Sequence, residues 1–182
     1  MRRNVNTLAA LCGATLALGT PAMSSGSHGS GTVSAGTHIV ITVTGRGVDG
    51  DTTGTFTLKA ARAAASGSGT IHLGGNISGP PPQPVPGYLG WRGTAEGHGE
   101  LVDGKQGGLW LSWSGSFITV NASSVYTGVM SGAWRITRGT GIYKNWKGTG
   151  RFVSTERHAP SPSDRPSGVG PYEARFVGLV TR

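Results

Sequence analysis

The chain has 182 residues, of which 33 are glycine and 13% are charged, and its formal net charge is +8. Glycine is far above its usual frequency but lacks the Gly-X-Y period of collagen, and a disordered chain would carry more charge and fewer aromatic residues. The glycines alternate with threonine, serine and single apolar residues. This composition is typical of short strands and tight turns in a single all-β domain.

The N-terminus has the three parts of a secretory signal peptide. Arg2 and Arg3 form the positive start, residues 8–18 form a short apolar core, and residues 20–22 offer a small-residue cleavage site. The apolar core is too short to anchor the chain across a bilayer. We therefore predict a cleaved signal peptide at residues 1–22 and a secreted, extracellular product. The general secretory and twin-arginine routes both stay open.

The chain after the signal peptide is predicted to be a flexible lead followed by one domain. Residues 23–36 are rich in serine and glycine, a composition typical of a flexible tether, and residues 37–182 form the domain. Cys12 is the only cysteine and leaves with the signal peptide, so we expect neither a disulfide nor thiol chemistry. No later run is long and apolar enough for a transmembrane helix.

Short segments of alternating apolar and polar residues fill the domain. They predict strands at residues 38–44, 53–60, 69–74, 88–102, 109–118 and 172–181, with turn residues at 45–50 and 103–105 between neighbouring strands. Alanine-rich residues 60–65 are the one place where a helical turn is plausible. Two further strands lie on either side of the glycines at 139–141.

Two proline-rich segments interrupt this pattern. Residues 79–87 contain five prolines, and residues 159–171 contain four. Proline has no backbone N–H for the hydrogen-bond ladder, so both segments are predicted to be loops rather than central strands. With about eight short strands, we predict a single antiparallel β-barrel, because closure removes the edges of a weakly charged sheet.

Residues 131–152 carry a pattern that resembles a known family. They read as strand, glycine turn, aromatic and basic connection, and second strand. The matching residues are Gly132, Trp134, Ile136, Gly139, Thr140, Gly141, Tyr143, Gly148, Gly150 and Phe152. Residues 96–100 and 104–109 look like the hairpin that precedes this motif. Residues 66–155 thus resemble bacterial secreted proteins with the allene oxide cyclase-like barrel, which plant dirigent proteins share.

The resemblance implies a barrel and a chemistry of positioning. Plant members cyclise an unstable fatty-acid epoxide, or steer the radical coupling of phenols, inside an apolar barrel mouth. They use few acid–base groups, and no plant catalytic residue maps onto a numbered position of this chain. The resemblance therefore implies the barrel and no particular active site or cofactor.

The best acid–base candidates are Glu96, His98 and Glu100, which a spacing of two places on one strand face. If this face lines the barrel, burial and like charge could raise a carboxyl pKa enough for general-acid work. If it faces water, the three residues form a solvated stripe paired with Arg92, which is the interpretation we favour. No set of residues suggests a metal site.

Aromatic and basic residues suggest a second candidate site. Trp91, Trp113 and Trp134 fall on the apolar faces of their strands and are predicted to lie in the core. Tyr143 and Trp146 lie in the connection and are predicted to be exposed. Basic residues crowd around these two aromatics, and the candidate binding set is Arg138, Tyr143, Lys144, Trp146 and Lys147.

Charge bears on the partner that such a surface would meet. Without Arg2 and Arg3 the chain has 14 basic and 8 acidic residues, a net charge of +6. A secreted basic surface meets anionic cell-envelope polymers more readily than nucleic acid, and no specific nucleic-acid partner is expected.

Three functions stay open at this point. In the first, which we favour, the barrel binds a small lipophilic or phenolic ligand. In the second, the basic and aromatic surface binds an envelope polymer. In the third, the barrel is an isomerase or cyclase that uses Glu96 or Glu100. No cofactor is expected under any of them, and the oligomeric state stays open.

Overall fold

A computed structural model describes residues 36–48, 51–61, 66–87, 89–122, 125–158 and 170–182. The predicted signal peptide, the flexible lead apart from Gly36, and the alanine-rich residues 62–65 lie outside this part of the chain, as do residues 159–169 of the second proline-rich segment. These four predictions therefore stay predictions.

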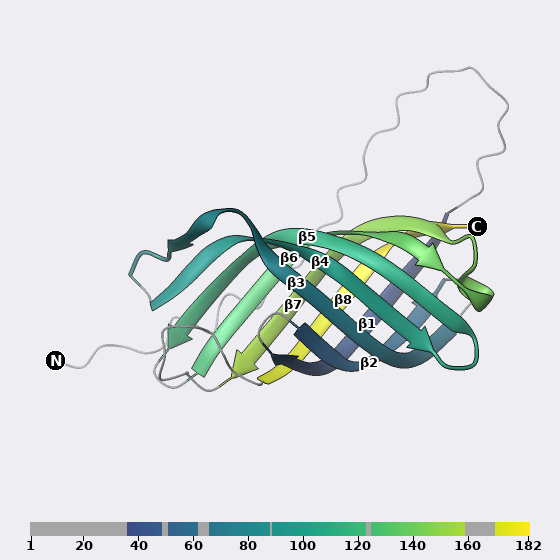
Figure 1. The fold of residues 1–182 in the computed structure, drawn as a ribbon, viewed down its shortest axis with the longest axis horizontal. Coiled ribbons are helices and arrows are strands. Elements are labelled where there is room, and N and C mark those ends of the chain that lie inside the picture. The colour runs from purple at the N-terminus through teal and green to yellow at the C-terminus, as the bar shows by residue number, and fades with distance from the viewer. Residues whose placement is uncertain (1–35, 49–50, 62–65, 88, 123–124, 159–169) are drawn as a thin grey trace, which may run out of the picture. The chain divides into compact units, whose positions relative to one another are not determined.

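Eight antiparallel strands form a closed barrel, which confirms the predicted fold class (Figure 1). The strands are β1 (Thr37–Val48), β2 (Asp51–Ala60), β3 (Ser66–Pro84), β4 (Leu89–Asp103), β5 (Gly107–Ala122), β6 (Val125–Gly139), β7 (Lys147–His158) and β8 (Gly170–Thr181). Each strand pairs with its neighbours in sequence, and β8 returns to pair with β1. Among the described residues, no helix has the length and apolarity needed to cross a membrane.

Strand alternation separates the core from the surface. Ile39, Ile41 and Val43 of β1 are fully buried, while Thr42 and Thr44 on the opposite face are exposed. Ile41 lies opposite Phe176 of β8 in the closing pair of strands, and Phe176 is buried as well. The inward face of every strand thus contributes to one apolar core inside the barrel.

Glycine allows the strands to approach closely at several inward positions, of which the β5–β6 pair is an example. Gly115 lies opposite Gly132 in the register of these strands. A Cβ atom on Gly132 would overlap the carbonyl oxygen of Ser114 and the Cα atom of Gly115. Only residues without a side chain fit there, as expected where a barrel wall bends.

The structure corrects two of the predicted boundaries. Strand β1 continues to Val48, so the chain does not turn at Gly45; Gly45 and Gly54 pair across β1 and β2 instead. Strand β3 continues to Pro84, so the first part of the proline-rich segment is strand rather than loop. Its register with β4 shifts between Ser78 and Gln83, and its pairing with β2 ends at Gly74. The prolines therefore lie where β3 has a partner on one side only, and Pro80, Pro81 and Pro82 fall in the interval where the register with β4 is interrupted.

The connection between β6 and β7 closes one end of the barrel. The predicted break at residues 139–141 is confirmed, since β6 ends at Gly139 and a short 3₁₀ helix, η2 (Gly141–Tyr143), follows. Gly141 has φ of 57°, a conformation that glycine adopts without strain. The side chains of Tyr143 and Trp146 then pack into the core, with their rings 5.2 Å apart in an edge-to-face arrangement. These two rings fill the end of the barrel.

Candidate functional site

A cavity of about 750 Å³ lies inside the barrel, towards the end away from η2. Its apolar lining comes from inward positions of β3 to β8 and includes Leu73, Trp113, Phe117, Met130, Phe152 and Phe176. Its polar lining includes Asp51, Thr119, Tyr126, Ser154, Glu156 and Tyr172. The strands position both sets, because residues two apart on one strand share a face.

Three aromatic rings, those of Trp113, Phe152 and Phe176, form the floor of the cavity, and the buried ring of Trp134 packs against Phe176 without lining it. Phe152 and Phe176, opposite each other on β7 and β8, stack with their centroids 5.3 Å apart. The rings of Trp113 and Trp134 meet these two edge to face, at 5.9 Å from Phe152 and 6.5 Å from Phe176. The indole nitrogen of Trp134 also donates a hydrogen bond of 3.0 Å to the carbonyl of Arg151. These contacts hold the rings in place and make the floor a rigid apolar surface.

Glycines on β3 and β4 make room for the indole of Trp113. A Cβ atom on Gly75 or Gly97 would overlap the six-membered ring of this indole. The indole nitrogen donates to the carbonyl of His98 at 3.3 Å. The lack of a side chain at Gly97 therefore leaves room for a close-packed neighbour, which is Trp113.

Two tyrosines and a glutamate gather at the open side of the floor. Glu156 lies opposite Tyr172 in the β7–β8 register and opposite Gly128 of β6. Burial raises the pKa of Tyr172 to about 12, with the Glu156 charge adding to the shift and a hydrogen bond with Ser154 opposing it. Burial also raises the pKa of Tyr126, which hydrogen-bonds with Thr119 and is near Glu156 as well. Both phenols are therefore neutral at ordinary pH.

Strand alternation also fixes the direction of the Glu156 side chain. Phe152, Ser154 and Glu156 occupy alternate positions of β7, and all three line the cavity. The Glu156 carboxylate reaches over Gly47 of β1, where a Cβ atom would overlap its Oε1. Gly47 is buried. The absence of a side chain at Gly47 therefore provides the space in which the carboxylate lies.

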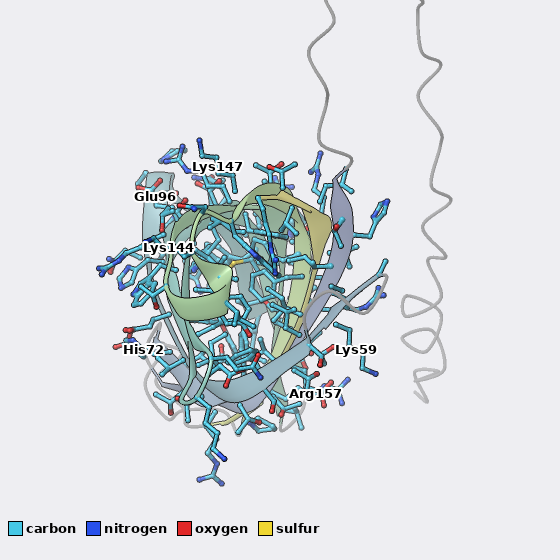
Figure 2. The ribbon with its side chains drawn as sticks, turned by 90° about the vertical axis from the view of Figure 1, so that its right-hand side faces the viewer. Lys59, His72, Glu96, Lys144, Lys147 and Arg157 are labelled. Atoms are coloured by element: carbon cyan, nitrogen blue, oxygen red, sulfur yellow. The ribbon has the colours of Figure 1, made fainter. Side chains whose placement is uncertain are left out.

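The predicted acid–base residues do not reach this cavity. Ala95, Gly99 and Leu101 of β4 are buried on the inner face, so Glu96, His98 and Glu100 between them lie on the outer face. Figure 2 shows Glu96 on the outside of the barrel. The structure therefore places all three residues on the outer face of β4, away from the cavity, and not on a face that lines the barrel. Among the described residues, no three His, Cys, Asp or Glu side chains converge as metal ligands.

The aromatic residues of the connection are also placed differently from the prediction. Tyr143 is 1% exposed and Trp146 is 5% exposed, so neither offers a surface to a partner. They are buried because the connection folds back over the barrel end. Trp134 lies in the core as predicted, and Trp113 is half-buried in the cavity wall, but Trp91 is 46% exposed.

The basic residues of the candidate set are exposed, and the sheet adds others to them. The side chains of Arg138, Lys144 and Lys147 are exposed, and the Arg138 guanidinium lies 4.8 Å from the centre of the Trp110 ring. The outer faces of β6 to β8 add Arg135, Arg151 and Arg175, which follow a diagonal across the three strands. We call these six cations the basic wall.

Sequence reasoning missed Tyr126, Glu156 and Tyr172 as candidate site residues. The signal was present, because Glu156 lies four residues after Phe152, an apolar residue of the same strand. Even spacing places Glu156 on the inner face as long as the strand continues. Tyr172 is likewise four residues before Phe176. The sequence did not show how far β6, β7 and β8 extend. Because these strands continue beyond the core, Tyr126, Glu156 and Tyr172 lie at the mouth of the cavity.

Comparisons with known proteins identify no relative of this chain. No family model matches it, and no curated protein or solved structure matches it either. The cavity and the basic wall are therefore the observations from which a role has to be inferred.

Proposed function

We propose that the barrel binds a small lipophilic or phenolic molecule in its cavity. The aromatic floor of the cavity is the observation that carries this proposal. A volume of about 750 Å³ falls within the usual range of ligand sites, which is roughly 300–1,000 Å³. The predicted signal peptide supports a place outside the cell, and the resemblance to allene oxide cyclase-like barrels supports a function by positioning.

The packing of the rest of the barrel makes this cavity unusual. Protein interiors are close-packed, and large voids are costly because the side chains that line them lose contacts. Below the floor the barrel is filled by Ile41, Leu58, Leu111 and their buried neighbours. Above the floor lies the open space of the cavity, whose lining includes Phe117 and Met130. A preformed apolar surface of this kind is suited to a ligand with an apolar body.

Gly128 offers a direct test, because it lines the cavity and has room for a side chain. A Cβ atom there would lie 3.7 Å from the Tyr126 ring and 3.8 Å from the Thr119 methyl group, which are ordinary contacts. We expect Gly128→Leu to fill the cavity and to weaken binding of the neutral fluorescent probe N-phenylnaphthylamine at least about tenfold, or 1.4 kcal/mol.

Gly128→Ala is the matched control and should bind the probe nearly as the unmodified protein does. The melting temperatures of both variants report whether the barrel is intact. Equal probe affinity in Gly128→Leu and Gly128→Ala would contradict a ligand site in the cavity. Weaker probe binding by Gly128→Leu alone would support the site. In that case, native mass spectrometry of the protein purified from culture supernatant would identify the natural ligand class if a molecule copurifies.

The basic wall supports a second candidate function, adhesion to an anionic cell-envelope polymer. Arg135, Arg151 and Arg175 occupy outer positions on neighbouring strands, about 7–8 Å apart along the diagonal. Charges at this spacing attract a polyanion without a specific pocket. Both functions can coexist, because the cavity and the basic wall use opposite faces of the same strands.

A further inference from the structure

We propose that the open end of the barrel, the end away from η2, docks on the surface of a lipid bilayer with the mouth of the cavity facing the lipid. The docking surface is an apolar rim, which consists of Ile77, Pro84, Leu89 and Trp91. Docking goes beyond the proposed ligand-binding function, and only its use as an entry route for the ligand rests on that function. The exposure of the rim, its connection to the cavity and the backbone that carries it support this assignment.

The apolar rim lies on a hairpin that extends past the neighbouring strand. β3 pairs with β2 only as far as Gly74 and then continues to Pro84 beside β4 (Figure 1). Leu89 is 77% exposed and Ile77 is 61% exposed, and Trp91 lies opposite Pro84 in the register. Single exposed apolar side chains are common, but several of them gathered on one projecting hairpin mark an interaction surface.

The rim is continuous with the lining of the cavity. Ile77 itself lines the cavity, and so does Phe117, whose ring lies against Gly93 of β4. Gly93 and Trp91 share a face of β4, because they are two residues apart. The hydroxyl of Thr119, another lining residue, accepts from the Trp91 N–H at 3.0 Å and donates to the Trp91 carbonyl at 3.2 Å. Apolar surface thus leads from the rim into the cavity.

The backbone of the hairpin suits lipid better than a protein strand. Five prolines lie within residues 79–87, and proline has no N–H group. The N–H of Val85 donates to the Gly90 carbonyl at 3.0 Å, and the N–H of Trp91 is bound by Thr119. Lipid offers no acceptor to a backbone N–H, whereas a protein strand that paired with this edge would need such donors. The prolines of β3 therefore favour lipid as the partner.

Charge at the open end is mixed, so apolar contact has to drive the docking. Arg46, Arg92 and Arg157 are exposed there, and so are Asp51 and Glu173. Tryptophan is favoured at the boundary between headgroups and acyl chains, because its ring is apolar and its N–H group is polar. We therefore expect docking on a zwitterionic bilayer that salt does not weaken, in contrast to adhesion through the basic wall.

Vesicles of phosphatidylcholine test the docking with the intact protein. We expect the protein to float with these vesicles as NaCl rises from about 0.1 to about 1 M, although this change shortens the screening length from about 10 to about 3 Å. Vesicles that also contain anionic phosphatidylglycerol are the comparison. Binding to the anionic vesicles alone, with loss of binding in salt, would assign the attraction to the basic wall and overturn docking through the rim.

The double variant Leu89→Gln with Trp91→Gln removes apolar surface from the rim and keeps the net charge. We expect its partition coefficient on phosphatidylcholine vesicles to fall at least about tenfold. Val102→Gln with Leu179→Gln is the matched control, because these two apolar residues are also exposed but lie near the closed end of the barrel. Equal partition of the two double variants would overturn the proposal. Melting temperatures report whether each barrel is intact.

Trp91→Phe keeps the rim apolar and keeps the proposal testable if the double variant fails to fold. The structure describes all five tryptophans, and Trp91 is the only one of them that is exposed. Phosphatidylcholine brominated in its acyl chains should quench the tryptophan emission of the unmodified protein. Most of this quenching should disappear in Trp91→Phe, while vesicle binding is kept. Unchanged quenching in Trp91→Phe would place another face against the lipid and overturn the proposal.

Failure of the docking and failure of the proposed function can be told apart. Gly128→Leu fills the cavity and leaves the rim intact, so it should bind phosphatidylcholine vesicles as the unmodified protein does. If N-phenylnaphthylamine binds as expected but the protein does not float with these vesicles, the docking is overturned and the ligand site stands. If the protein floats but Gly128→Leu and Gly128→Ala bind the probe equally, the ligand site is overturned and the docking stands.

Discussion

At the scale of single residues, the closed end of the barrel contains a buried polar pair. The hydroxyl of Tyr143 donates to the Asp103 carboxylate at 3.3 Å, and both residues are buried. Gly67 at the start of β3 faces this pair, and a Cβ atom there would overlap the hydroxyl. From the sequence, Asp103 was predicted only as a turn residue and Tyr143 only as an exposed ring. Neither local pattern shows that two residues 40 positions apart in the chain form a hydrogen bond.

The phenol of Tyr143 predicts how stability changes in alkali. Burial raises its pKa from 10.0 to about 12, and the Asp103 charge and hydrogen bond add to the shift. Since the folded value lies above the unfolded value, the contribution of this phenol is complete below pH 10.0 and is lost as the pH rises towards 12. Urea unfolding at a series of pH values should therefore show a falling free energy of unfolding across this window.

Tyr143→Phe should make that fall shallower. Tyr172, whose pKa is also raised to about 12, and Tyr126, whose pKa is raised by burial as well, account for the part that stays. Below the window, Tyr143→Phe should cost about 1–3 kcal/mol, because the buried Asp103 loses a donor. Lys144→Ala, an exposed neighbour, should change stability by less than about 0.5 kcal/mol. The same alkaline slope in Tyr143→Phe and the unmodified protein would contradict this assignment.

At the scale of elements, the sequence predicts a strand well where apolar and polar side chains alternate. It predicts the length of a strand less well, because the length depends on which neighbouring strands are available for backbone pairing. Ile39, Ile41 and Val43 identify the inner face of β1 from the sequence alone, and the structure agrees. The length of β3 was underestimated, because Pro80 and its neighbours indicate a loop. They are tolerated in an extended segment that pairs with β4 alone, a condition that only the sheet topology reveals.

The pairing of β5 with β6 allows a test of the close approach of these strands. Gly132→Ala would place a Cβ atom against the Ser114 carbonyl and the Cα atom of Gly115. We expect a loss of about 1–3 kcal/mol in the free energy of unfolding, as for other overpacked sites. Ser131→Ala, on the exposed face of the same strand, is the control and should be nearly neutral. Equal stability of the two variants would mean that the strands can separate at little cost.

At the scale of the whole molecule, barrel closure decides which face of each strand is inside. The alternation in β4 separated Glu96 and His98 from Ala95 and Gly97, but it did not say which set faced the interior. The cavity is likewise a property of the closed barrel, since its lining comes from β2 to β8 and no single segment contains it. The sequence therefore predicts the fold class better than the site.

Charge is the other property of the whole molecule, and it predicts how the barrel meets a polyanion. The net charge of +6 without Arg2 and Arg3 attracts any polyanion weakly, but the basic wall concentrates cations on one side. Each basic residue near an anionic surface contributes about 1 kcal/mol, so reversing Lys144 and Lys147 to glutamate should lower affinity by at least about 30-fold. Retention on polyglutamate resin and on isolated cell-wall material, eluted with salt, measures this effect.

The control for this prediction has the same change in net charge at another place. Arg46 and Lys59 are exposed residues of β1 and β2, and Lys59 lies on a different side of the barrel from Lys147 (Figure 2). If the basic wall carries the binding, Arg46→Glu with Lys59→Glu should elute much closer to the unmodified protein than Lys144→Glu with Lys147→Glu. If net charge alone decides, the two double variants should elute together, and the basic wall would have no role as a site. Neither pair touches the cavity, so probe binding should be unchanged in both.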